Sequence, residues 1–237
     1  MATKYGGELI MQTSFISPQR RMLVINPNTN PEVTARVRLA VDGSARFDSH
    51  IEVVNPLEGP FSIVTAQDRE TAKEQVLDIA AKTMSDPFDA YILACFDDFA
   101  VDEVAFATGR VTIGMCEAGM LAASRIAPTF SIVTTVKSAV QGIVELTKKY
   151  EVDKVSLVRA ADISIEDAAA FGQTSECLDK AIQSAIDDDH AQAILLGSGA
   201  LAGYGDELSF RFGVPFVDGV SEAVKLAEQR IVLSRNY

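Results

Sequence analysis

The sequence of 237 residues predicts an α/β protein with two domains related by a pseudo-twofold axis, each containing a four-stranded parallel sheet flanked by helices. Two observations support this prediction. Short apolar runs alternate with longer segments of helical composition, which is the pattern of βα units around a parallel sheet. The order of these runs also repeats along the chain, which indicates an internal duplication.

Eight strands are predicted, in two sets of four. The first set spans residues 22–25, 50–54, 90–94 and 111–114, and the second spans 131–133, 154–158, 193–196 and 215–217. Matching positions in the two sets are separated by a nearly constant offset: 104 residues between Ile51 and Val155, and 103 residues between Cys95 and Ser198. Repeated βα units without duplication are the alternative, and a nearly constant offset across four strands favours duplication.

Helices are predicted between these strands. The first begins at Pro31, because proline is favoured at the first helical position, and Val33, Val37 and Ala40 follow at helical spacing. The other predicted helices span residues 65–82, 138–150, 175–187 and 219–231. No linker rich in Pro, Gly or Ser separates the two sets, so the domains are expected to be closely coupled.

The composition excludes several classes of function. With 33 acidic against 21 basic side chains and a net charge of −12, neither nucleic acid nor an anionic membrane is an expected partner. The apolar runs are far shorter than the ~20 residues that span a bilayer. Residues 1–21 lack the apolar segment of a secretory signal and are predicted to be a flexible extension, which favours a cytoplasmic protein.

Three cysteines and two histidines restrict the chemistry further. Cys95, Cys116 and Cys177 match neither a disulfide framework nor a zinc pattern, so no metal site is expected. Cys116 is expected to be a core or reserve thiol and Cys177 a core residue. His50 and His190 are expected at the surface, so neither could complete a hydrolase triad with a serine.

Small polar groups follow most of the strands. In a parallel sheet the carboxyl ends of the strands carry the ligand groups, and helix N-termini there favour an anion. The candidate segments are 26–30, 95–98 and 116–117 in the first half, and 134–135, 197–199 and 218–219 in the second. No glycine-rich nucleotide motif is present, so a nucleotide is not expected.

Cys95 is the strongest candidate for a chemical role. It follows an apolar strand, and a helix N-terminus at that corner would lower its thiol pKa from about 8.5 toward 7. The alternative is a buried, inert thiol. Its duplicated position is Ser198, and a pseudo-twofold axis would bring the two residues to opposite walls of one cleft. That geometry suits chemistry on both faces of one carbon.

The sequence resembles the hydantoin and allantoin racemases of the aspartate/glutamate racemase superfamily. The resemblance covers residues 22–229 in collinear order, and its motifs are 22–29 (MLVINPNT), 55–56 with 59–60 (NP, GP), 91–98 (YILACFDD), 130–135 (FSIVTT), 158–163 (VRAADI) and 214–228 (VPFVDGVSEAVKLAE). It implies two α/β domains, with the chain end returning to the first. The domains would then comprise residues 22–118 with 219–237, and residues 119–218.

The resemblance implies racemisation at the carbon alpha to a carbonyl of a cyclic ureide, allantoin or a 5-substituted hydantoin, without a cofactor. One cysteine from each domain would flank the substrate, one removing a proton and the other delivering one. Cys95 matches the first cysteine. The second normally lies in a Gly-Cys-Ala-Gly-Met stretch, which here reads Gly-Ser-Gly-Ala-Leu at 197–201, so Ser198 stands in its place.

Ser198 is the main departure from the family pattern. A hydroxyl is a far weaker acid and base than a thiol, and no histidine is expected to activate it. Turnover should therefore be impaired in at least one direction. Three explanations stay open: an engineered replacement that holds substrate without turnover, a one-cysteine relative such as a decarboxylase, and a two-domain protein that binds its ligand without chemistry.

The remaining site predictions concern substrate binding. Asn26, Thr134 and Thr135 are expected to hydrogen-bond the ring edges, and the resemblance also suggests Ser62 and Glu117 for the pocket. Backbone N–H groups at Phe96, Asp97 and Gly199 would stabilise the enolate oxygen. The expected partners are a small-molecule substrate and further copies of the chain in a homo-oligomer. Phe99 and the stretch 114–117 depart from the family pattern and leave the exact substrate open.

Overall fold

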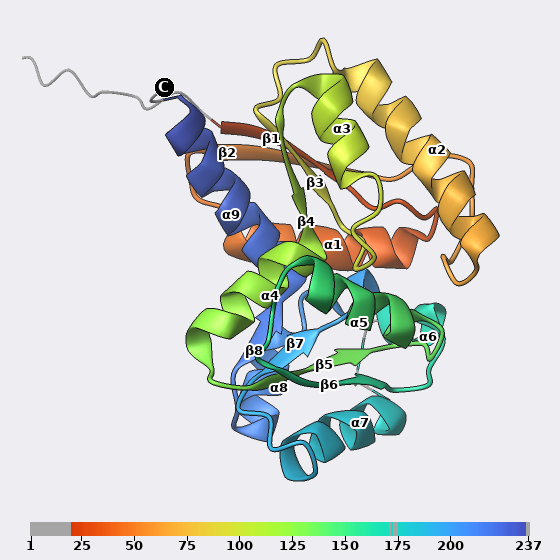
Figure 1. Cartoon of the computed structure of the whole chain (residues 1–237). Coiled ribbons are helices and arrows are strands. Elements are labelled where there is room, and N and C mark those ends of the chain that lie inside the picture. Colours follow the sequence, from red (N-terminus) through yellow and green to blue (C-terminus); the bar gives the residue numbers. More distant parts are fainter. Residues whose placement is uncertain (1–19, 171, 173–174, 236–237) are drawn as a thin grey trace, which may run out of the picture.

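The computed structural model describes residues 20–170, 172 and 175–235. Within them the chain forms two four-stranded parallel sheets, one in each half of the sequence (Figure 1). The first has the order β2-β1-β3-β4 and the second the order β6-β5-β7-β8. Because the two orders are equivalent, the predicted duplication and fold class are confirmed.

All eight predicted strands are present. Their bounds are β1 (Arg20–Ile25), β2 (Ser49–Val54), β3 (Ala90–Leu93), β4 (Val111–Gly114), β5 (Phe130–Thr134), β6 (Val155–Ala160), β7 (Ile194–Leu196) and β8 (Phe216–Asp218). β1 begins two residues before the predicted start, since Arg20 is buried and pairs with Asp48 at 2.6 Å. The rest of the predicted extension, residues 1–19, lies outside the described residues.

The described helices include all five predicted ones and several shorter ones. They are α1 (Pro31–Ser44), α2 (Ala66–Thr83), α3 (Val101–Thr108), α4 (Met115–Ile126), α5 (Ala139–Lys149), α6 (Ile165–Ala169), α7 (Glu176–Asp187), the 3-10 helix η1 (Gly199–Leu201), α8 (Gly205–Phe212) and α9 (Gly219–Ser234). Local caps explain several of their starts. Asn30 caps α1, and Thr65 with Asp68 forms a capping box on α2.

Two apolar clusters hold the first sheet between helices. On one face, Leu23 and Tyr91 pack with Val76 of α2 and Val104 of α3. The opposite face belongs to a larger cluster that continues into the second half, where it includes Ile194. The alternation of side chains along a strand sends neighbouring residues to these two different faces.

Three helices lie between the two sheets. In Figure 1, α1 and α4 lie across the middle of the molecule, and α9 runs from there up the left side of the first sheet; α9 packs against α1, α4 and β4. α4 contacts β4 of the first sheet and β7 and β8 of the second, so it touches both sheets. The packing of α9 fits a first domain of residues 22–118 with 219–237, although this division of the chain stays a prediction.

Candidate functional site

A cavity of about 70 Å³ lies between the two halves, at the carboxyl ends of β1, β3, β5 and β7. We call it the central cavity. The first wall consists of the loop after β1, a residue of α1, Ile63, and the loop after β3. The second wall consists of the end of β5, the first residue of α5, Ile165, and the loop after β7. The lining residues are Pro27, Asn28, Val33, Ile63, Ala94, Cys95, Phe96, Asp97, Thr134, Thr135, Val136, Ala139, Ile165, Gly197, Ser198, Gly199 and Ala200.

Cys95 and Ser198 both line the central cavity, one from each half. Cys95 lies two residues beyond the end of β3, and Ser198 lies two residues beyond the end of β7. Since β3 and β7 are the third strands of their sheets in both sequence and space, the two residues occupy equivalent places in the duplicated fold.

The environment of Cys95 differs from the predicted one. Turns lie between Cys95 and the next helix, α3, which begins only at Val101, so the strand does not lead directly into a helix at Cys95. Burial raises the pKa of the Cys95 thiol well above its ordinary value, and the charge of Asp97 adds to the effect. A hydrogen bond from the Asp97 backbone N–H opposes the rise without reversing it. The prediction of a lowered pKa is therefore wrong.

Ser198 has no general base beside it. Its side-chain oxygen accepts a hydrogen bond from the Ala200 N–H at 3.3 Å, which caps η1. The residues that line the central cavity include no His, Lys or Arg, and both histidines are exposed elsewhere, as predicted. A hydroxyl without such a neighbour is a far weaker acid and base than a thiol.

Five further predicted residues line the central cavity. They are Phe96, Asp97, Thr134, Thr135 and Gly199. The Thr134 hydroxyl donates to the Gly197 carbonyl at 2.8 Å, and Asp97 accepts from Arg69 at 2.6 Å. Among the described residues, no hydrogen-bond acceptor faces the backbone N–H of Phe96 or Gly199, so both donors are available.

Three predicted residues do not line the central cavity. The Asn26 amide is 0% exposed and donates to Asn28 at 3.1 Å and to Thr34 at 3.0 Å, so it orders the loop after β1. Glu117 forms an ion pair with Arg230 of α9 at 2.9 Å. Ser62 donates to Glu166 at 2.5 Å, and this bond joins the two halves beside Ile63 and Ile165.

Some residues that line the central cavity were not predicted from the sequence. Asn28, two positions after Asn26, is the amide that lines the central cavity, and only the fold of the loop distinguishes the two. Ile63, Val136 and Ile165 contribute apolar walls that no motif marked. Asp98, at the end of the candidate segment 95–98, has no predicted role of its own, yet it is buried and holds the loop after β3 in place.

The other two cysteines have different outcomes. Cys116 is 0% exposed at the start of α4, in agreement with a core position. Cys177 is exposed, and the prediction of a core position is wrong. The buried face of α7 is formed by Leu178, Ile182 and Ala185, and a residue one position before Leu178 points about 100° away from that face.

Neither a metal-binding cluster nor a membrane-spanning helix is present among the described residues. Within residues 20–170, 172 and 175–235, no group of three or more His, Cys, Asp or Glu side chains is arranged to hold a metal ion. None of the helices in the same ranges has the length and apolarity that a membrane crossing demands.

Comparison with known proteins gives the family. The model of the family Asp/Glu/Hydantoin racemase matches residues 22–227. The chain belongs to this family. A hydantoin racemase from Pseudomonas sp. (strain NS671) is 30% identical over 217 residues, which cover 91% of this chain and 87% of the relative. The predicted resemblance is thus confirmed.

Two solved structures of the same family share the fold. Allantoin racemase from Klebsiella pneumoniae superposes with a TM-score of 0.87 at 29% identity, covering 91% of this chain and 89% of that chain. Allantoin racemase from Pseudomonas fluorescens superposes with a TM-score of 0.82 at 27% identity, covering 90% of this chain and 92% of that chain.

Proposed function

We propose that this protein is a cofactor-independent racemase or epimerase that moves a proton at the carbon alpha to a carbonyl of a cyclic ureide, allantoin or a 5-substituted hydantoin. The observation that carries the proposal is the presence of Cys95 and Ser198 at equivalent positions on the two walls of one cavity. The family and the hydantoin and allantoin racemases that the chain is similar to support the same reaction.

The charge of the central cavity favours a neutral ring as substrate. Asp97 is the one charged side chain among the described residues that line it, and Asp97 is paired with Arg69 at 2.6 Å. A dicarboxylate would enter without a cation to balance it, which costs several kcal/mol in a buried site. A ureide ring instead needs hydrogen-bond donors and acceptors, which Asn28, Thr134 and Thr135 can supply.

In the proposed mechanism, Cys95 acts on one face of the alpha carbon. Because burial holds its pKa high, the thiol form dominates at neutral pH, and Cys95 starts as a proton donor. To act as a base, Cys95 must react as its minor thiolate form, which takes the alpha proton and becomes the thiol. The thiol exchanges its proton with solvent and returns a proton to the same face of the enolate. The N–H groups of Phe96 and Gly199 would stabilise the enolate oxygen, each contributing about 3 kcal/mol to the transition state.

Ser198 would serve the opposite face. A hydroxyl without a neighbouring base exchanges protons slowly at neutral pH, so inversion should be much slower than proton exchange on the Cys95 face. We therefore propose that the protein is impaired as a racemase and that cysteine at position 198 restores the second acid–base group.

Deuterium exchange tests this mechanism. A single enantiomer of allantoin and of several 5-substituted hydantoins is incubated in D₂O at pH 7 with the unmodified protein, with Ser198→Cys and without protein. The NMR signal of the alpha proton measures exchange, and optical rotation measures inversion. We expect exchange without inversion for the unmodified protein, and both processes for Ser198→Cys. If neither protein exchanges the proton of any of these substrates above the blank, the proposal is wrong.

The same assay distinguishes the alternatives. Release of carbon dioxide from an arylmalonate-like diacid would indicate a one-cysteine decarboxylase, and tight binding without exchange would indicate a binding protein. The proposal also includes a cytoplasmic location and a homo-oligomer, and light scattering on the purified protein measures the number of subunits.

A further inference from the structure

A buried carboxylate, Asp98, lies three residues after Cys95. Its side chain is 4% exposed in total and accepts three hydrogen bonds. Two come from backbone N–H groups at the start of α4, those of Cys116 at 3.0 Å and Glu117 at 2.8 Å. The third comes from the hydroxyl of Tyr150, the C-cap residue of α5, at 2.8 Å. Asp98 therefore joins the loop after β3 to one central helix and to the second half of the molecule.

Asp98 also fixes the turn that contains Cys95. Its backbone N–H donates to the Cys95 carbonyl at 3.2 Å, which closes a turn of four residues. Its φ of 45° lies in the left-handed region, which is strained for a residue other than glycine. The three hydrogen bonds to the carboxylate offset this cost and hold the turn in one conformation.

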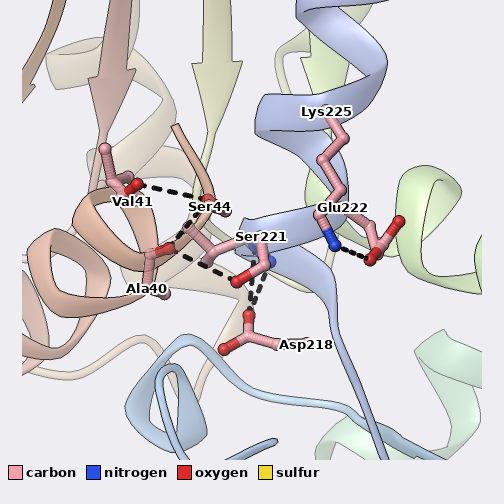
Figure 2. Close-up of polar contacts among 8 residues, drawn as sticks. Ala40, Val41, Ser44, Asp218, Ser221, Glu222 and Lys225 are labelled. Atoms are coloured by element: carbon pink, nitrogen blue, oxygen red, sulfur yellow. Dashed lines mark hydrogen bonds and ion pairs between the residues drawn. The ribbon is translucent and has the colours of Figure 1, made fainter. Parts of the chain in front are cut away.

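The second half achieves the same connection with a different residue. There Asp218, the last residue of β8, accepts from the N–H groups of Val220 at 2.9 Å and Ser221 at 3.3 Å at the start of α9 (Figure 2). It also accepts from the N–H of Gly203 at 2.5 Å, in the loop that follows Ser198. Each half thus uses one carboxylate to join the loop after its third strand to the helix after its fourth strand.

In the first half, the carboxylate comes from a different position in the fold than in the second half. Gly114 pairs with Leu93 and Asp218 pairs with Leu196, so Gly114 is the counterpart of Asp218 in the duplicated sheets. A Cβ atom at Gly114 would lie 2.3 Å from Asp98 Cγ. The Asp98 carboxylate therefore occupies the space beside position 114, and it adds a contact that has no match at Asp218, the hydrogen bond from Tyr150 across the two halves.

We propose that Asp98 and Tyr150 are positioning residues that hold the Cys95 turn at a set distance from the Ser198 wall. Two chains of contacts lead from Asp98 to the second wall. In the first, Asp98 holds α4, α4 packs on β7, and β7 leads to Ser198. In the second, Asp98 bonds Tyr150 at the end of α5, and the first residue of α5, Ala139, lines the central cavity. Neither Asp98 nor Tyr150 lines the cavity, so both act through Cys95. The catalytic part of this inference rests on the proposed racemase function.

Tyr150→Phe is the decisive variant, because it removes the hydroxyl and keeps the packing of the ring. Tyr91→Phe is the matched control, since the Tyr91 hydroxyl bonds Thr83 at 3.1 Å on the far face of the first sheet. The first measurement is alkylation of the native protein by iodoacetamide, followed by mass spectrometry. It compares the rate at Cys95 with the rate at the exposed Cys177 in the same chain.

We expect Tyr150→Phe to raise the ratio of Cys95 to Cys177 alkylation about fivefold or more, because a loosened turn exposes the thiol. Tyr91→Phe should leave the ratio within twofold. An unchanged ratio in Tyr150→Phe, or an equal change in both variants, overturns the inference. This measurement needs no substrate, so it decides the positioning role even if no hydantoin is turned over and the proposed function fails.

The second measurement is deuterium exchange of a hydantoin in the Ser198→Cys background. Misplacement of a reacting group by about 1 Å lowers rates as much as a hundredfold, so we expect Tyr150→Phe to lower kcat about tenfold with KM within twofold. A purely structural role would instead lower the unfolding midpoint and leave kcat of the folded protein unchanged. Asp98→Asn combined with Tyr150→Phe should lose no more than Asp98→Asn alone, because the Tyr150 hydroxyl acts through its hydrogen bond to Asp98. Additive losses contradict the link.

Discussion

The space beside Gly114 is filled by the carboxyl group of Asp98, so that a Cβ atom at position 114 would lie 2.3 Å from Asp98 Cγ. The three nearest atoms are the carbon and both oxygens of this carboxyl group, at 2.3–2.4 Å, so there is no room for even a methyl group. Glycine at 114 and aspartate at 98 are therefore linked, although 16 residues separate them in the sequence.

Gly114→Ala should displace the Asp98 carboxylate and break its hydrogen bonds to α4. We expect the free energy of unfolding to fall by about 2–4 kcal/mol, because overpacking and the loss of buried hydrogen bonds add together. Urea denaturation measures the change. Gly43→Ala is the control, since Gly43 is exposed in α1 with no atom within 4 Å of its Cβ position, and it should stabilise by up to about 1 kcal/mol. Equal effects of the two changes would contradict the link between Gly114 and Asp98.

Asp98 should make stability depend on pH. Burial raises the pKa of its carboxyl to about 7, with a further contribution from the charge of Glu117. The unfolded chain has a carboxyl pKa of about 3.9, so the folded protein binds this proton more tightly. The resulting stabilisation is complete below about pH 4 and is lost as the pH rises through about 7, and it amounts to at most about 4 kcal/mol.

The variant Asp98→Asn isolates this contribution. Urea denaturation at intervals from pH 4 to pH 8 gives the free energy of unfolding of both proteins. The unmodified protein should lose stability relative to the variant as the pH increases over this range. Parallel curves for the two proteins would show that Asp98 does not titrate as described.

Cys95 and Ser198 should contribute very differently to proton exchange. Cys95→Ala should lower deuterium exchange of a hydantoin by a hundredfold or more, because it removes the acid–base group of that face. Ser198→Ala should change the exchange rate by less than about twofold, since a hydroxyl without a base transfers protons slowly at pH 7. A large loss in Ser198→Ala would assign an active role to the hydroxyl.

Arg36 should be important for stability although it lies outside the central cavity. Its guanidinium is buried, lies 3.8 Å from the centre of the Tyr204 ring, and donates to the carbonyls of Ala169 at 3.0 Å and Ala170 at 2.8 Å. Arg36→Met removes the Arg36 donors to both carbonyls, of which Ala170 still accepts from the Tyr204 hydroxyl at 3.1 Å, and should lower the free energy of unfolding by about 3 kcal/mol. Arg38→Met is the control, because Arg38 is exposed, and its effect should stay within about 0.5 kcal/mol. Thermal and urea denaturation measure the stability of both variants. Equal losses in Arg36→Met and Arg38→Met would contradict this role of Arg36.

Much of the fold could be predicted from the sequence because its signals are local. Apolar runs such as 90–94 mark buried parallel strands, and Pro31 marks a helix start. Helix α4 was not predicted, and its structure explains why. Its N-cap residue, Gly114, has no side chain to cap the helix, and the cap comes from Asp98 instead. A cap supplied from another loop leaves no pattern at the start of the helix.

Part of the site could also be predicted from the sequence, because its signals are local as well. Duplication placed Cys95 and Ser198 at equivalent strand ends, and both line one cavity. The choice between Asn26 and Asn28 depended on how one loop folds, and no periodic pattern distinguishes them. The direction of the Cys95 pKa depended on burial and on the charge of Asp97. The burial of the thiol and its distance from Asp97 both depend on how the loop folds, so a predicted helix at the strand end gives no information about them.

The sequence by itself determined the two equivalent sheets, the family motifs and the pairing of Cys95 with Ser198, because strand periodicity, duplication and motif spacing are properties of the linear chain. Only the tertiary structure decided that the Cys95 thiol stays protonated, that Cys177 faces outward, and that Asp98 joins the Cys95 turn to Tyr150. These features arise from burial and from partners up to 52 residues apart. Their physical origin is desolvation and hydrogen bonding among segments that meet only when the two halves pack together.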